Sequence, residues 1–355
     1  MRKITPWRAG LFLLSAALLA GCSKPTPPPA EQQPAAIDPA ALQNFAPLPD
    51  EVPGAQAATP DLVNLGRMLY YEPRLSKSQT ISCNTCHDLS KYGVDGEPTS
   101  DGHKGQKGDR NSPTVFNAAA HFAQFWDGRA PDVETQAKGP VLNPVEMAMP
   151  SESMVVAVLE SMPEYVEAFK RAFPGQAKPI TYDNMARAIG AFERKLMTPS
   201  RWDALLKGDQ NALTPEERLG FKTFTEAGCQ MCHSGALLGG TSYQRLGEVK
   251  PHPRATDPGR MKVTNQEADR AAFKVPSLRN VEKTGPYFHD GETGTLEQAV
   301  KEMAEYQLGK TLTDQEVRQI VDFLKVLTGR IDPEYIKPPA LPPSTATTPK
   351  PQPGD

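Results

Sequence analysis

Two copies of the pentapeptide Cys-x-x-Cys-His constrain this chain more than any other feature of its sequence. Two cysteines three positions apart on a helical turn can each form a thioether bond to one haem, and the histidine that follows can then bind the iron. A chance match is rare for one copy and far rarer for two. We therefore predict two covalently bound c-type haems. The residues that would attach them are Cys83, Cys86, His87, Cys229, Cys232 and His233.

Zinc binding and disulfide formation are the alternative uses of these cysteines. One zinc ion could take all four thiolates, but it would not need a histidine directly after each pair, and most of the chain separates the pairs. Disulfides are expected where an exported protein has free thiols. The chain has five cysteines, and two haems would use all of them except Cys22. We prefer the haems because they account for the histidines as well.

The N-terminus has the three parts of a secretory signal, which we predict for residues 1–21: a basic start, an apolar stretch and small residues at its end. The apolar stretch is too short to span a bilayer. Residues 19–22 (LAGC) resemble the bacterial lipoprotein processing box, in which the cysteine is acylated. We expect a periplasmic lipoprotein anchored through Cys22, with the outer membrane as a candidate. An ordinary signal peptide with a chance cysteine is the alternative.

Size and charge narrow the class of protein. The chain has 355 residues, of which 38% are apolar, and this suffices for two ordinary domains. The formal net charge is −3, and removing the three cations of the leader leaves −6. A negative protein is a poor partner for a phosphate backbone, so we expect no nucleic acid partner.

Helix signals dominate between two proline-rich flanks. Residues 22–58 and 333–355 contain few large apolar side chains, so we predict an extended tether and a disordered tail. No long run between them alternates with period two, so the fold class should be mainly α. Thr59, Thr214 and Thr313 provide helix caps ahead of apolar residues at helical spacing, and a further pattern of this kind begins at Thr181.

A weak internal repeat divides the helical core. A Thr-Pro pair followed by Leu-Gly occurs in residues 59–66 before the first pentapeptide and again in residues 214–220 before the second. Each half therefore looks like one helical unit that leads to one haem site. We place an N-terminal haem domain at residues 59–198 and a C-terminal haem domain at residues 199–332, packed together.

Five motifs resemble those of the bacterial di-haem cytochrome c peroxidase family and occur in the family's order. They are Ser82–His87, Arg110–Asn117, Gln124–Arg129, Gly285–His289 and Gln307–Gly309. The resemblance implies two cytochrome c-like domains that reduce hydrogen peroxide to water with electrons from a small cytochrome c or cupredoxin. Such an enzyme needs one iron that can open to peroxide and a second with two fixed ligands. A homodimer would also fit, because the family often dimerises.

For the N-terminal haem, the resemblance implies roles for four residues. His103, in a glycine-rich loop, corresponds to the distal iron ligand that leaves on activation. Glu146 corresponds to the acid/base of the peroxide pocket, Gln136 to a hydrogen-bonding neighbour, and Trp126 to the aromatic residue between the haems. Without the resemblance we would interpret His103 as an exposed loop histidine, Glu146 as a surface glutamate and Trp126 as a core tryptophan.

For the C-terminal haem, the resemblance implies that Met303 is the axial partner of the histidine. A thioether ligand raises the potential and suits the port of electron entry. Met261 is the competitor by position. The resemblance also implies a calcium site at the domain interface, formed by the side chain of Asn111 and the carbonyl oxygens of Thr284 and Pro286, which are ligands that Ca²⁺ accepts.

Three other functions remain open. The methylamine-utilisation relatives of this family oxidise tryptophans of a partner protein, and they have tyrosine where Met303 stands here. A di-haem electron carrier is favoured if His103 never leaves the iron. A peroxide sensor would need an output domain, for which the sequence shows no candidate.

Overall fold

The structure is a computed structural model that describes residues 1–6 and 37–352. Residues 37–352 belong to one compact unit. Most of the predicted signal peptide, together with Cys22 and the start of the predicted tether, lies outside the described residues. In the part that is described, no helix is both long and apolar enough to cross a membrane.

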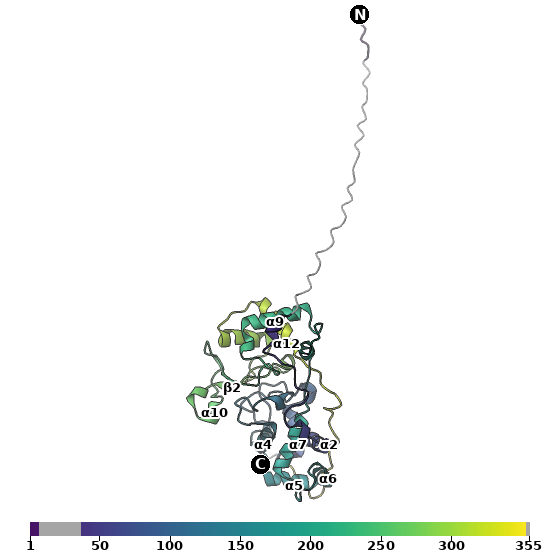
Figure 1. Cartoon of the computed structure of the whole chain (residues 1–355), viewed down its shortest axis with the longest axis vertical. Helices are drawn as coiled ribbons and strands as arrows, with labels where there is room; N and C mark the ends of the chain where they lie inside the picture. Colours follow the sequence, from purple (N-terminus) through teal and green to yellow (C-terminus); the bar gives the residue numbers. More distant parts are fainter. Residues whose placement is uncertain (7–36, 353–355) are drawn as a thin grey trace. The chain divides into compact units, whose positions relative to one another are not determined.

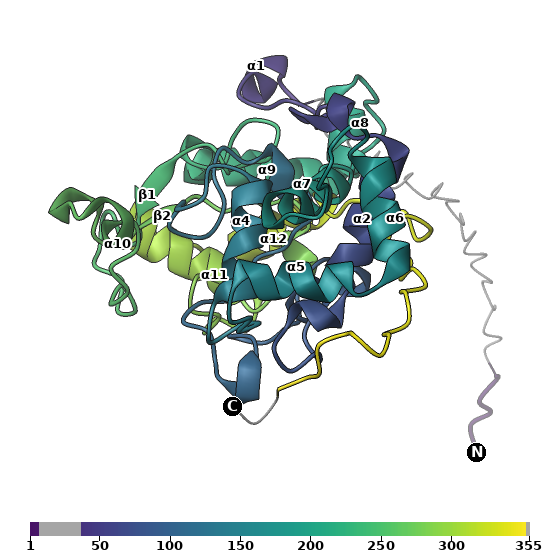
Figure 2. The same cartoon turned by 90° about the horizontal axis from the view of Figure 1, so that it is seen from below.

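The prediction of a mainly α fold is confirmed (Figures 1 and 2). The helices are α1 (Pro39–Leu42), α2 (Pro60–Tyr70), α3 (Cys83–Cys86), α4 (Val133–Leu142), α5 (Glu152–Glu160), α6 (Pro163–Ala172), α7 (Tyr182–Glu193), α8 (Arg201–Leu206), α9 (Pro215–Ala227), α10 (Met261–Thr264), α11 (Leu296–Glu302) and α12 (Asp314–Val326). The strands β1 (Tyr243–Arg245) and β2 (Ala272–Lys274) pair antiparallel, with Tyr243 opposite Lys274.

The N-terminal half is built on the crossing of α2 and α7. The side chain of Thr59 caps α2 by accepting a hydrogen bond from the backbone N–H of Leu62, and Thr181 caps α7 in the same way. A Cβ added to Gly66 would lie only 1.9 Å from the carbonyl oxygen of Ala188, so the two backbones meet where the glycine stands. Leu69 and the other buried apolar residues of these helices form the core of this half.

The C-terminal half repeats this arrangement with α9 and α12. Both helices begin with a capping box, at Thr214 and Thr313. A Cβ added to Gly220 would lie 2.1 Å from the carbonyl oxygen of Gln319. The glycine of the internal repeat therefore has the same role in each half, which is to let two helices approach closely.

A buried polar cluster at Thr198 joins the halves beside the predicted boundary. The Thr198 hydroxyl accepts hydrogen bonds from the side-chain amides of Asn117, at 2.8 Å, and Asn280, at 2.9 Å. Asn117 belongs to the N-terminal half and Asn280 to the C-terminal half. All three residues are at most 1% exposed, so the junction is fixed by specific hydrogen bonds.

The tether prediction is wrong for residues 37–58, which pack against the C-terminal half. The Phe45 ring makes edge contacts with Trp202 and Phe221, at centroid distances of 5.4 and 5.6 Å. The backbone N–H of Leu48 donates to Asp203 at 2.7 Å, and Val52 is fully buried. Composition misled here, because a few apolar anchors suffice to order a proline-rich segment.

The prediction of a disordered tail is also wrong, because residues 333–352 run along the N-terminal half past α2 and α6 (Figure 2). The Tyr335 ring stacks on Phe192 at 5.1 Å. Further along, Arg74 donates to the carbonyl oxygen of Pro342 at 2.8 Å, and Gln79 donates to that of Pro349 at 2.8 Å. Proline has no backbone N–H to donate, but its carbonyl oxygen still accepts hydrogen bonds. A proline-rich segment can therefore dock through its carbonyl groups, which composition alone does not indicate.

Candidate functional site

Each pentapeptide lines its own cavity. The N-terminal cavity, of about 610 Å³, is lined by Cys83, Cys86 and His87, and the C-terminal cavity, of about 190 Å³, by the second pentapeptide. The four cysteines have free thiols. Because the two pairs face different cavities, they cannot share one zinc ion. Each cavity instead offers two thiols and one half-buried imidazole, which is the set that a c-type haem requires.

His233 lines the C-terminal cavity because α9 ends just before the pentapeptide. Gly228 adopts φ 96°, a left-handed conformation, and the chain turns into a short 3₁₀ helix at residues 229–231. The Nδ1 of His233 lies 3.1 Å from the carbonyl oxygen of Leu238. Donation from Nδ1 to that carbonyl leaves the lone pair of Nε2 for iron, and burial lowers the pKa of His233, which favours the neutral ring that a metal needs.

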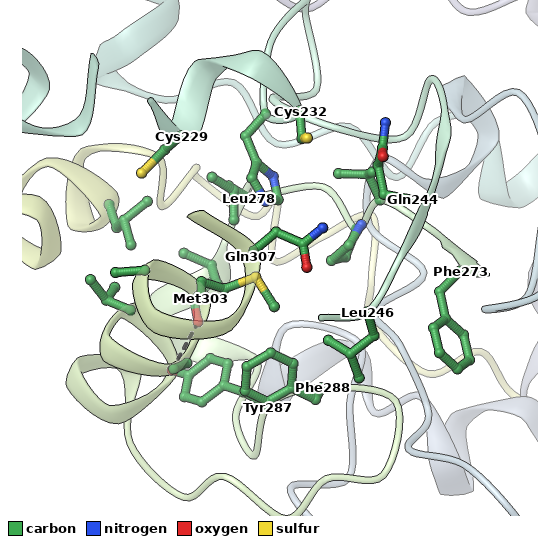
Figure 3. A pocket seen from close by; sticks show the side chains of 18 of the residues that line it. Cys229, Cys232, Gln244, Leu246, Phe273, Leu278, Tyr287, Phe288, Met303 and Gln307 are labelled. Atoms are coloured by element: carbon green, nitrogen blue, oxygen red, sulfur yellow. Dashed lines mark hydrogen bonds between the residues drawn. The ribbon is translucent and has the colours of Figure 1, made fainter. Parts of the chain in front are cut away.

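Met303 lines this same cavity, and Met261 does not. Figure 3 shows Cys229 and Cys232 on one side of the cavity and Met303 on the other. Met303 begins a π-helical turn, residues 303–307, that follows α11. Such turns change the direction of side chains within a helix and are frequent at functional sites.

The N-terminal cavity contains the predicted acid. Glu146 and Gln136 both line it. The side-chain amide of Asn143 donates to Glu146 Oε1 at 2.8 Å. Burial raises the pKa of Glu146, while the nearby Arg129 and the bond from Asn143 oppose that rise. Glu146 therefore sits in the cofactor cavity and holds its proton more tightly than a surface glutamate does.

His103 lies beside this cavity but is not among the residues that line it. It is 4% exposed, and its backbone N–H donates to the carbonyl oxygens of Val145, at 2.9 Å, and Glu146, at 2.8 Å. A Cβ on Gly102 would lie 1.9 Å from the carbonyl oxygen of Val145. The glycine thus lets the loop of His103 lie directly against the segment that carries Glu146.

Trp126 lines both cavities. Its indole N–H donates to the carbonyl oxygen of Asn111 at 2.9 Å, and its own carbonyl accepts from the backbone N–H of Lys274 at 2.8 Å. One bond comes from each half of the molecule, so the ring is fixed between the two haem sites. A role of Trp126 between the haems stays a prediction.

The predicted calcium ligands are partly located. Asn111 is buried, its side-chain amide donates to the carbonyl oxygen of Glu97 at 3.0 Å, and its backbone N–H donates to that of His289 at 2.8 Å. Within residues 37–352, no hydrogen bond joins Asn111 to Thr284 or Pro286. The calcium site therefore remains a prediction.

Glu193 also lines the N-terminal cavity, and sequence reasoning missed it. It is 4% exposed, and burial, with a contribution from Glu134, raises its pKa to about 8. A signal was present, because Glu193 continues the buried stripe of Met185 and Ile189 at four-residue spacing on α7. A carboxyl at an apolar position of a helix indicates a special environment.

Comparisons with known proteins agree with the assignment of one haem site to each half of the chain. A sequence model of the family described as di-haem cytochrome c peroxidase matches residues 60–211, and one described as cytochrome c matches residues 218–328. A protein of Nitrosomonas europaea named cytochrome c551 peroxidase is 50% identical over 303 residues, which cover 84% of this chain and 89% of the relative. A protein of the same name from Pseudomonas aeruginosa is 46% identical over 314 residues, covering 86% and 90%.

A solved structure extends the likeness to the fold. It is that of a MauG-like protein associated with microbial copper homeostasis, which is 27% identical. It superposes with a TM-score of 0.73 over 82% of this chain and 97% of that one. The likeness therefore includes both halves of the molecule.

Proposed function

Because the chain belongs to the bacterial di-haem cytochrome c peroxidase family, we propose a division of labour between its two cavities. The protein carries two c-type haems and is an oxidoreductase that acts on hydrogen peroxide. We assign peroxide reduction to the N-terminal cavity and electron entry to the C-terminal one. One observation carries this assignment: four acids, Asp109, Asp127, Glu146 and Glu193, line the first cavity, and no Asp or Glu is among the residues that line the second.

When bound, the haem irons supply the electrons that break the O–O bond of peroxide. Glu146 supplies proton transfer. Its Oε1 accepts the hydrogen bond from Asn143, so Oε2 would be free to take a proton from one peroxide oxygen and to return it to the other, which leaves as water. The raised pKa of Glu146 suits this role, because an acid that must also give its proton back works best near the operating pH.

His103 is proposed as the removable ligand on the N-terminal side. Its backbone hydrogen bonds to the carbonyls of Val145 and Glu146 tie the loop of this residue to the acid segment. Movement of His103 away from the cavity would therefore also shift Glu146. Through this link, departure of His103 would both free a coordination position for peroxide and reposition Glu146.

Met303 and His233 are proposed as the fixed ligands on the C-terminal side. A thioether ligand would raise the potential of a haem that His233 also binds, so this site would accept electrons first from a small cytochrome c or cupredoxin. Trp126 lines both cavities and is the proposed route between them, with Gln136 as a hydrogen-bonding neighbour of the acid.

The cellular setting of the enzyme is a separate proposal. We infer a periplasmic lipoprotein anchored through Cys22, from the sequence of residues 19–22. We also infer a calcium ion at Asn111, Thr284 and Pro286, where a hard cation would stabilise the interface next to Trp126. We also infer that two copies of the chain form a homodimer, as the resemblance to the family implies.

A di-haem electron carrier and a protein-oxidising enzyme are the competing functions. A carrier has no use for a half-buried glutamate with a raised pKa in one cavity only. The protein-oxidising relatives are distinguished by tyrosine in place of Met303, and a methionine lines the cavity here. Both observations favour the peroxidase.

The test compares peroxide turnover by the wild-type holoprotein and by Glu146→Gln, with a reduced small cytochrome c as donor. We expect kcat to fall about 10²–10⁴-fold while both haems stay attached and reducible, because only proton transfer is lost. Glu164→Gln, at an exposed position on α6, is the matched control and should be unaffected. Turnover within a factor of about three of the wild type would place the acid elsewhere. No turnover by the wild type with any donor would favour the carrier.

A further inference from the structure

A buried lysine faces the C-terminal cavity without a carboxylate partner. Lys274, the last residue of β2, is 7% exposed and lines the cavity. Its Nζ lies 3.1 Å from Nδ1 of His121, a residue of the N-terminal half. Among the ion pairs of the described residues, none includes Lys274.

Nothing in the surroundings supplies the missing negative charge. No Asp or Glu is among the residues that line this cavity, and the only other lysine or arginine there is the exposed Arg245. Burial, with the neighbouring Lys274, lowers the pKa of His121 well below its usual range, so the imidazole is neutral and accepts a hydrogen bond. A buried ammonium without a counter-ion is costly, and burial lowers the pKa of Lys274 to about 8.

The cofactor of this cavity brings the charge that the protein lacks. A c-type haem is attached through its vinyl edge, here to Cys229 and Cys232, and its two propionate carboxylates project from the opposite edge. Figure 3 shows Phe273, the neighbour of Lys274 on β2, away from Cys229 across the cavity. We propose that Lys274 binds a propionate of the C-terminal haem, while its Nζ also donates to His121.

This contact would link the two halves through the haem. Lys274 belongs to the C-terminal half and follows Phe273 along β2, its backbone N–H donates to Trp126, and His121 belongs to the N-terminal half. A fixed positive charge favours the reduced haem, because reduction lowers the net charge of the iron by one. Lys274 would therefore raise the potential at the port of electron entry. The inference rests on a haem in this cavity, as the proposed function does, but not on the role of Glu146.

The first measurement is a redox titration of each haem in the holoprotein. Lys274→Met should lower the equilibrium constant for reducing the C-terminal haem ~10-fold, which is about 59 mV for one electron, and leave the N-terminal haem unchanged. Lys274→Arg keeps the charge and should stay close to the wild type. Lys170→Met, which removes an exposed lysine of α6, is the control for loss of charge alone. An unchanged C-terminal potential in Lys274→Met would overturn the proposal.

The second measurement needs no variant. Infrared difference spectra of the wild type, with ¹³C-labelled propionates, are recorded on reduction of the C-terminal haem alone. We expect a labelled carboxylate band shifted from that of a free carboxylate, as for an ion pair. A band typical of solvated carboxylates at both propionates would overturn the proposal even if Lys274→Met fails to fold. Neither measurement uses peroxide, so failure of this inference is distinct from failure of the peroxidase assignment.

Discussion

Replacing Glu193 with glutamine should change the way in which the stability of this protein depends on pH. The carboxyl is buried beside the N-terminal cavity, and its pKa is raised from 4.5 to about 8 in the folded protein. In the unfolded chain the pKa returns to its ordinary value, so the folded state binds this proton more tightly. The contribution of Glu193 to the free energy of unfolding is therefore most favourable below pH 4.5 and is lost as the pH rises to about 8.

The size of the effect follows from that interval. At ~1.4 kcal/mol for each pH unit, the range from 4.5 to about 8 corresponds to about 5 kcal/mol. Water entry and movement of the neighbouring ion pair between Arg194 and Glu134 reduce this value, so we expect ~2–4 kcal/mol. Glutamine keeps the shape of the side chain and stays neutral at every pH. The free energy of unfolding of the variant should therefore not fall with rising pH on account of this position.

The assay is urea unfolding of the holoprotein at pH 5 and pH 9, for the wild type, Glu193→Gln and the exposed control Glu164→Gln. Groups that titrate in all three proteins cancel when each variant is compared with the wild type at the same pH. Between pH 5 and pH 9, Glu193→Gln should gain ~2–4 kcal/mol relative to the wild type, and Glu164→Gln should gain nothing. The same pH dependence in Glu193→Gln and the wild type would refute the reasoning.

Four further results are expected. Arg279→Met should lower the free energy of unfolding by about 3–5 kcal/mol in urea titrations, because Arg279, at 1% exposure, is the buried partner of Asp203; a loss below about 1 kcal/mol would contradict this. Met303→His should lower the potential of the C-terminal haem in a redox titration, and an unchanged potential would exclude Met303 as the ligand. His103→Gly should bind peroxide spectroscopically without prior reduction, unless another residue is the gate. Deleting residues 338–355 should lower the free energy of unfolding in urea by ~2–4 kcal/mol, because several hydrogen bonds to the N-terminal half are lost. An unchanged unfolding midpoint would show that this segment does not dock.

The helix starts were readable from the sequence because their signals are local. Thr214 and Thr313 lie within three residues of every partner in their capping boxes, so no knowledge of tertiary structure is needed to recognise them. The repeated glycines could be noticed in the sequence, but their purpose could not. It became clear only when Gly66 and Gly220 were each found against a helix from a distant part of the chain.

The site was readable only in part, for the same reason. The pentapeptides carry their chemistry within five residues, so the haem sites could be predicted directly. Glu146 by itself resembled a surface glutamate, because the burial that raises its pKa comes from residues outside its own segment. Lys274 gave no signal at all, since a lysine becomes unusual only when its surroundings are known to lack a carboxylate.

The exchange of flanking segments between the halves affects how the molecule can be assembled. Phe45, near the start of the range 37–352, completes the C-terminal core, and Tyr335, near the end of that range, packs on the N-terminal core. The N-terminal half therefore cannot reach its final packing until residues 333–352 have been synthesised, although its own pentapeptide is made early. A cut near Pro199 would not yield two independent single-haem proteins. The N-terminal fragment would lack residues 333–352, which cover part of its core, and the C-terminal fragment would lack residues 37–58, which cover part of the other core. Each fragment would therefore expose apolar surface, and mixing the two fragments should restore more order than either has alone.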